Sequence, residues 1–176
     1  MVTLIKEDGT GKADANSYAD YEECVAYHEA NYHVGAWEAV LAEDAAACLV
    51  MATRVIDAEY QFNGARAVAG QALQWPRTDC PDPDGGEEAV MASDAVPAAV
   101  VRACCEMARE LYLNDRTAAP PGEGIAQQHN SDMSATVYSK SDTRPIISHL
   151  TQAMLGKYGR LYREGGRGGM VRLVRV

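Results

Sequence analysis

The chain has 176 residues, which is enough for one domain with a hydrophobic core. Its formal net charge of −9 argues against nucleic-acid binding over the whole surface, because such binding neutralises phosphates with Lys and Arg. No run of about 18 apolar residues occurs, so we expect no membrane span. The polar N-terminal stretch also lacks the apolar core of a secretory signal.

The cysteines predict a reducing folding compartment without designed disulfides. There are five of them, an odd number, and none forms a CxxC pair. Cys24, Cys48 and Cys104 fall on expected apolar helix faces, where a free thiol behaves as a small hydrophobic group.

The first half of the chain predicts two helices. The first fifteen residues are expected to be extended, and a helix follows over residues 16–32, capped by Asn16 or Ser17. Gly35 ends this helix, and a longer one is predicted over residues 36–60, with an apolar face broad enough for burial on more than one side. Apolar and aromatic residues recur along the first helix at spacings of three and four: Tyr18, Tyr21, Val25, His28 and Tyr32.

The second half predicts two more helices separated by irregular segments. Residues 61–96 lack periodicity and are rich in Gly and Pro, which favours one long loop. Helices are predicted over 97–115 and 144–164, with a short strand or hairpin near 133–140. The expected fold class is therefore mainly α: a small four-helix domain with long loops over residues 1–164, followed by a glycine-hinged arm over 165–176.

No catalytic or metal-binding pattern is recognisable, so we expect no enzymatic activity, no cofactor and no metal. The sequence has no GxSxG nucleophile elbow. His28 and His33 are five residues apart, which is outside the spacing of a helical zinc site. The acidic run over 79–88 lacks the ligand order of an EF-hand, and we interpret it as a solvated loop.

The C-terminal twenty residues differ in charge from the rest of the chain. Residues 157–176 carry +5, whereas residues 1–156 carry −14. This asymmetry predicts a negatively charged partner: nucleic acid, an acidic protein surface or the acidic body of a neighbouring copy, with a frayed tail as the alternative. The predicted partner-binding arm combines basic residues with an apolar, β-prone tip: Lys157, Arg160, Arg163, Arg167, Met170, Val171, Arg172, Leu173, Val174, Arg175 and Val176.

The string "GQALQWPRTD" (70–79) holds the second group of candidate residues. Its Trp, Gln and Arg residues have no base, nucleophile or ligand set beside them, so we interpret them as a loop anchor or subunit interface, with a base-stacking platform as the alternative. Arg77 is expected to pair with a carboxylate, and Arg54 to face Asp57. The candidates are Gln71, Leu73, Gln74, Trp75, Pro76 and Arg77.

Three strings carry a resemblance to a known family. "ANSYAD", "ATRVIDAEYQFNG" and "GQALQWPR" are similar to strings in head–tail adaptor, or head-completion, proteins of tailed phages, from about Ala15 to Leu113. Relatives also carry the label DnaT-like single-stranded-DNA-binding protein. The resemblance implies a dodecameric ring of identical copies in the virion neck, beneath the portal protein and above the next neck or tail-completion protein. Packaged double-stranded DNA would pass through it without tight binding.

Two functions therefore remain open. The first is a structural head-to-tail adaptor, assembled in the host cytoplasm and carried in the virion, without a membrane partner. The second is a single-stranded-DNA-binding replication accessory. The family label, the aromatic residues and the +5 tail favour the second, whereas the charge of −14 over residues 1–156 opposes it.

Overall fold

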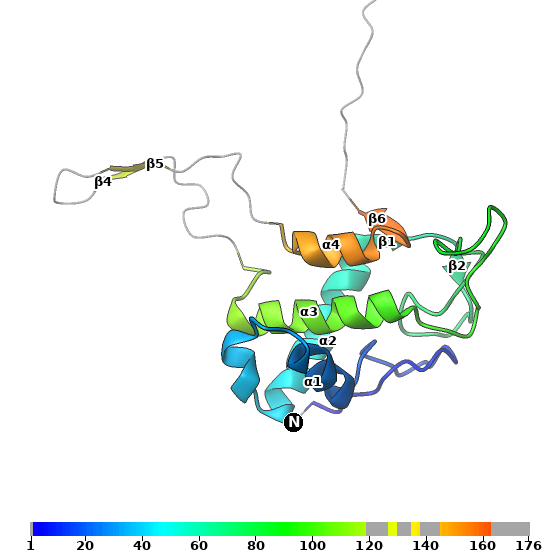
Figure 1. Cartoon of the computed structure of the whole chain (residues 1–176), viewed down its shortest axis with the longest axis horizontal. Coiled ribbons are helices and arrows are strands. Elements are labelled where there is room, and N and C mark those ends of the chain that lie inside the picture. The colour runs from blue at the N-terminus through cyan, green and yellow to red at the C-terminus, as the bar shows by residue number, and fades with distance from the viewer. Residues whose placement is uncertain (1, 119–126, 130–134, 138–144, 163–176) are drawn as a thin grey trace, which may run out of the picture.

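The computed structural model describes residues 2–118, 127–129, 135–137 and 145–162 and is mainly α (Figure 1). The described residues contain four α-helices and one 3₁₀ helix: α1 (Tyr21–Glu29), η1 (Gly35–Ala39), α2 (Ala42–Glu59), α3 (Ala98–Leu113) and α4 (His149–Leu155). This confirms the predicted fold class of a small four-helix domain with long loops. In the described part of the chain, no helix has the length and apolar character that a membrane crossing requires.

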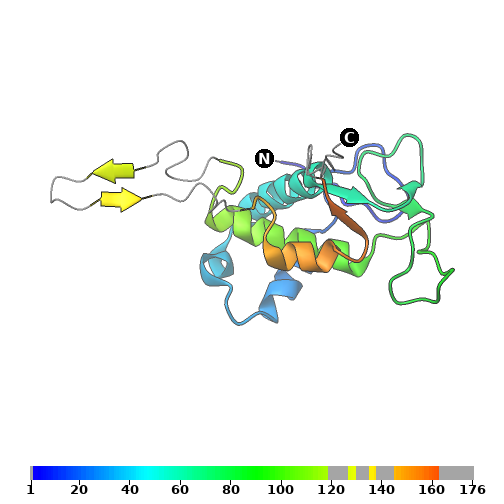
Figure 2. The same cartoon turned by 90° about the horizontal axis from the view of Figure 1, so that it is seen from above.

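Short strands form three antiparallel pairs in the described residues. The pairs are β1 (Tyr60–Phe62) with β6 (Gly159–Leu161), β2 (Ala65–Arg66) with β3 (Arg77–Thr78), and β4 (Gln127–His129) with β5 (Ala135–Val137). The strand or hairpin expected near 133–140 is confirmed by β5. The β4–β5 pair lies apart from the helical body in both views (Figures 1 and 2).

The core centres on α3, which α2, α1 and α4 all contact. Figure 1 shows α4 on one side of α3 and α1 on the other, with α2 behind. Small residues at the α2–α3 contact let the two helices pack closely. The buried residues of these two helices include Ala45, Leu49, Ala52, Ile56, Val100, Ala103, Cys104 and Met107.

The first helix is shorter than predicted because Asp20, and not Asn16 or Ser17, caps it. The Asp20 carboxylate accepts from the Glu23 N–H at 2.8 Å, and the Glu23 carboxylate accepts from the Asp20 N–H at 3.1 Å. This reciprocal pair is a capping box, which satisfies two otherwise unpaired N–H groups. Tyr18 is buried ahead of the helix, and Tyr32 lies beyond its end with 93 % exposure, so the predicted helical stripe is wrong at both ends.

The predicted second helix is interrupted. Trp37 lies in η1, where its ring contacts those of His28 and Tyr112 at centroid distances of 5.4 and 5.6 Å. Val40 and Leu41 then adopt extended backbone, and α2 begins at Ala42. The extended pair lets the Trp37 ring reach α1 and α3, while Leu41, which falls inside the predicted second helix, is 61 % exposed.

The predicted fourth helix ends early, at Leu155, because the chain turns back to pair with β1. Gly159 lies opposite Phe62 in this pair, and a Cβ atom on Gly159 would lie 2.5 Å from the Gln61 carbonyl oxygen. Only glycine tolerates such a close backbone approach. The glycine-hinged arm predicted over 165–176 lies outside the described residues.

Candidate functional site

The loop over residues 70–79 turns its largest side chain into the core. Trp75 is fully buried, and its ring lies against those of Phe62 and Tyr158 at centroid distances of 5.7 and 6.0 Å. The peptide bond between Trp75 and Pro76 is cis. A ring buried between two aromatic neighbours has no face left for a nucleobase, so Trp75 does not form the base-stacking platform considered from the sequence.

A partly buried carboxylate of α2 holds this loop to the body. Asp57 accepts from the Tyr18 hydroxyl at 2.5 Å and from the Gln74 backbone N–H at 3.0 Å. The Tyr18 oxygen in turn accepts from the N–H groups of Gln74 and Trp75 at 3.1 and 3.3 Å. Burial raises the pKa of Asp57 to about 6, against the opposing effect of the Tyr18 hydrogen bond. Asp57 thus binds the loop rather than Arg54, which is exposed.

Arg77 binds backbone carbonyl groups and not the carboxylate that the sequence predicted. Its guanidinium donates to the carbonyl oxygens of Asn63 at 2.6 Å, Gly64 at 2.7 Å and Gln74 at 2.9 Å. The rigid fork of five N–H donors suits several acceptors at once, and the side chain is buried. Arg77 therefore closes the loop onto the end of β1.

Gln71 fixes the other side of the loop. Its side-chain amide donates to the carbonyl groups of Leu73 and Pro76 at 2.8 and 3.0 Å, and its carbonyl oxygen accepts from the Val68 N–H at 2.8 Å. The structure thus brings the predicted loop residues together. The side chains of Gln71 and Arg77 form their hydrogen bonds with groups of the same chain. Their arrangement holds the shape of the loop.

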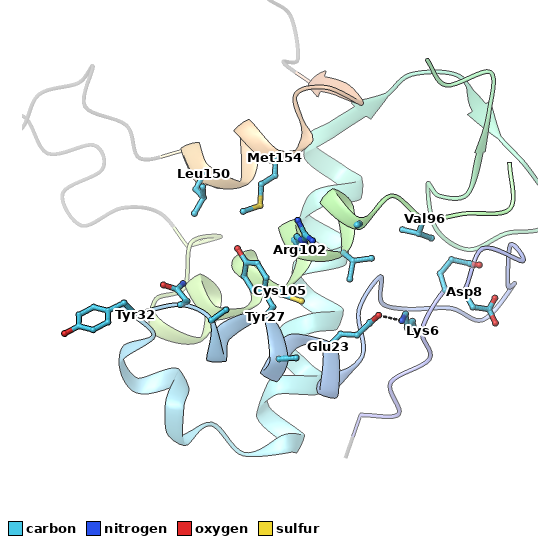
Figure 3. A pocket seen from close by; sticks show the side chains of 16 residues that line it. Lys6, Asp8, Glu23, Tyr27, Tyr32, Val96, Arg102, Cys105, Leu150 and Met154 are labelled. Carbon is cyan, nitrogen blue, oxygen red and sulfur yellow. Dashed lines mark ion pairs between the residues drawn. The ribbon is translucent and has the colours of Figure 1, made fainter. Parts of the chain in front are cut away.

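An open groove lies elsewhere, between α1, α3 and α4 (Figure 3). It has a volume of about 1090 Å³. Figure 3 shows Leu150 and Met154 of α4 across from Tyr27 of α1. An ion pair of 2.5 Å between Lys6 and Glu23 lies at one end. Its apolar lining includes Ala26, Tyr27, Val96, Val101, Leu150 and Met154.

Sequence reasoning did not find this groove. Helical periodicity indicates which residues of a helix are apolar, but it does not show which of them a neighbouring helix will cover. Leu150 is an apolar residue of the predicted fourth helix, yet it is 52 % exposed at the rim of the groove.

Burial shifts the pKa of a thiol and of an imidazole in the core. Burial raises the pKa of Cys104 to about 12, which keeps it a neutral thiol. Burial also lowers the pKa of His28, whose Nε2 lies 3.0 Å from the Cys105 carbonyl oxygen. In the part of the chain that the structure describes, no group of three or more His, Cys, Asp or Glu residues could hold a metal ion.

The first residues of the predicted partner-binding arm belong to the folded body and lie on its surface. Lys157 forms an exposed ion pair with Asp84 of the acidic loop at 3.1 Å, and Arg160 in β6 donates to the Gln61 side chain at 3.2 Å. The Tyr162 N–H donates to the Glu59 carbonyl oxygen at 2.6 Å. The described chain therefore ends beside the last residue of α2, and the remaining arm residues lie outside the described residues.

Comparison with known proteins shows the family of the chain. A family model described as "Putative DnaT-like ssDNA binding protein" matches residues 2–176. The chain belongs to this family. No curated protein and no solved structure matches the chain. The description of the DnaT-like family agrees with the second function considered from the sequence, single-stranded DNA binding, and nothing in the comparisons supports the phage head–tail adaptor.

The described part of this DnaT-like chain places its aromatic residues unevenly. Trp37, Trp75 and Phe62 are buried, whereas Tyr32 and Tyr162 are exposed. Single-stranded DNA is usually bound in a basic groove with exposed aromatic rings. Of these two exposed tyrosines, only Tyr162 lies within the basic segment 157–176.

Proposed function

We propose that the protein is a non-enzymatic assembly protein, a head-to-tail adaptor that forms a ring beneath the portal of a tailed phage. The observation that carries the proposal is the apolar groove between α1, α3 and α4, open on a body that carries −14 over residues 1–156. An exposed apolar groove suits a protein partner, whereas nucleic acid is held mainly by Lys and Arg. The adaptor identity rests on the resemblance of "ANSYAD", "ATRVIDAEYQFNG" and "GQALQWPR".

The residues of these strings support a structural role because they connect three segments of the body by hydrogen bonds. Tyr18, Asp57 and Gln74 form one hydrogen-bonded cluster, and each comes from a different string. A ring subunit has to hold its contact surfaces in a fixed relation, and a cluster that joins three segments of the body suits that requirement. The acidic body also suits a channel through which DNA slides.

Native mass spectrometry of the full chain mixed with the portal protein of its own phage tests the proposal. The expected result is a complex in which several copies bind each portal ring. Absence of any complex with the portal contradicts it. A monomer in the absence of portal does not, because the portal can act as the template for the ring.

The family description favours a second function, single-stranded DNA binding. The exposed Tyr162 and the basic segment 157–176 are the features that would serve it. Fluorescence anisotropy with a labelled single-stranded oligonucleotide, repeated across a salt series, separates the two functions. The adaptor proposal predicts no saturable binding at low salt. Saturable binding whose affinity falls steeply with salt concentration would support the second function instead.

A further inference from the structure

We propose that the groove between α1, α3 and α4 receives residues 167–176 of a neighbouring copy. The inference rests on the proposed ring assembly and names the contact that joins its subunits. Three observations support it: the groove and the segment are both apolar, the body and the segment have opposite net charge, and the chain after Tyr162 is long enough to reach a neighbouring copy.

The apolar match comes first. Leu150 stands at the rim of the groove with half of its surface exposed, and Val101 and Met154 are half-buried beside it. Apolar side chains left open around a concave surface mark a protein contact. The segment "RGGMVRLVRV" supplies apolar residues in a short, β-prone stretch: Met170, Val171, Leu173, Val174 and Val176.

The charges also match. Residues 167–176 contain three arginines and no acidic residue, while residues 1–156 carry −14. Asp8 and Glu23 line the same groove and are partly exposed, but Lys12 and Lys6 already neutralise part of their charge, and the exposed Arg102 also lines the groove. The electrostatic attraction on a basic segment therefore comes from the body as a whole and not from the groove lining.

The point where the chain leaves the body favours a neighbouring copy over the same copy. Tyr162 lies beside Glu59 at the end of α2, and α2 contributes no residue to the lining of the groove. Figure 2 shows β6 running from the α4 side toward the end of α2, so the chain leaves on a different side from the groove.

The remaining chain is long enough for this contact. Residues 163–176 span at most about 48 Å when fully extended. A compact chain of 176 residues has a radius of gyration of about 16 Å. The segment can therefore cross from one copy to the groove of the next in a ring.

Sedimentation velocity on full-length variants tests the two halves of the contact. Leu150→Glu places a charge in the groove, and Leu173→Asp with Val174→Asp places charges in the segment. We expect the wild type to self-associate. In each variant, the concentration at which half of the copies are associated should be at least tenfold higher than in the wild type. Leu41→Glu is the matched control, because Leu41 is as exposed as Leu150 and lies outside the groove lining. It is expected to behave as the wild type.

Mixing the two deficient variants gives the decisive result. The Leu150→Glu copy keeps its segment and the segment variant keeps its groove, so an equimolar mixture should form 1:1 dimers and nothing larger. Native mass spectrometry distinguishes these dimers by mass. Circular dichroism checks each fold, and Met154→Lys serves as a second groove variant if Leu150→Glu loses helical signal.

Three outcomes would overturn the inference. They are a wild type that remains monomeric up to about 200 µM, a mixture that forms no 1:1 dimer because the segment binds its own groove, and a groove variant that associates as the wild type does. If the groove variants still assemble on the portal, the adaptor proposal stands and only this contact is wrong. If 1:1 dimers form but no copy binds the portal, the adaptor proposal fails instead.

Discussion

Asp57 joins the segment before α1 to the loop after α2, because it accepts from both the Tyr18 hydroxyl and the Gln74 N–H. Burial raises its pKa from 3.8 to about 6. The folded carboxyl group therefore binds its proton more tightly than the unfolded one. The free energy of unfolding from this group is highest below about pH 4, falls as pH rises to about 6, and differs by about 3 kcal/mol across that range.

Asp57→Asn removes this titration, so we predict a flatter dependence of stability on pH. Urea unfolding between pH 4 and 7 measures it, with exposed Asp94→Asn as the control. The control should retain the wild-type slope, including any contribution from His28, whose pKa burial lowers. An unchanged slope in Asp57→Asn would show that its carboxyl group does not titrate there.

Trp75 and Tyr32 form a second comparison between buried and exposed residues. Trp75→Ala removes a fully buried ring and is expected to lower the free energy of unfolding by about 3–5 kcal/mol. Tyr32→Ala changes a ring that is almost fully exposed and should change it by less than about 0.5 kcal/mol. Equilibrium denaturation checks both, and equal effects would argue against Trp75 as a core anchor.

The sequence allowed Trp75 to be interpreted as an anchor, because no base, nucleophile or ligand set lies beside it and a large ring gains stability from burial. The partner of Asp57 could not be predicted. Tyr18 lies 39 residues away, and a side-chain contact between distant segments leaves no local pattern. The helical spacing of three pointed to Arg54, which is exposed.

At the scale of elements, α3 was predictable to within two residues at each end because its apolar residues recur regularly and Pro97 precedes it. The second and fourth helices were predicted too long. Contacts between distant segments end them: Trp37 packs between α1 and α3, and Gly159 pairs with β1. Periodicity within a segment carries no information about such contacts.

Gly159→Ala tests the β1–β6 pair. The added methyl group would meet the Gln61 carbonyl oxygen at 2.5 Å, so strand pairing has to shift and stability should fall by about 1–3 kcal/mol. Gly70→Ala is the control, since nothing lies within 4 Å of a Cβ atom there and its effect should stay below about 1 kcal/mol. Thermal unfolding of both variants compares them. A neutral Gly159→Ala would contradict the close approach of the two strands.

At the scale of the whole molecule, an acidic body and a basic C-terminal segment coexist in one chain, and the sequence alone predicts that asymmetry. It does not predict the groove, because the groove depends on how α1 and α4 sit against α3. The groove suits a protein partner, whereas the basic segment suits either an acidic protein surface or nucleic acid.

Deleting residues 168–176 should leave the fold intact and weaken assembly. The four described helices lie within residues 21–155, so the far-ultraviolet circular dichroism spectrum should keep its helical signal. Sedimentation velocity should show less association than for the full chain. Loss of helical signal in the deletion would mean that the segment belongs to the fold and not to assembly.

Electron microscopy of the full chain bound to its own portal protein tests the adaptor proposal most directly. We predict a closed ring of copies stacked beneath the portal, with an open channel along the common axis. A portal that remains bare when the protein is present in excess would contradict the account, and saturable single-stranded DNA binding in the same preparation would assign the chain to the second function.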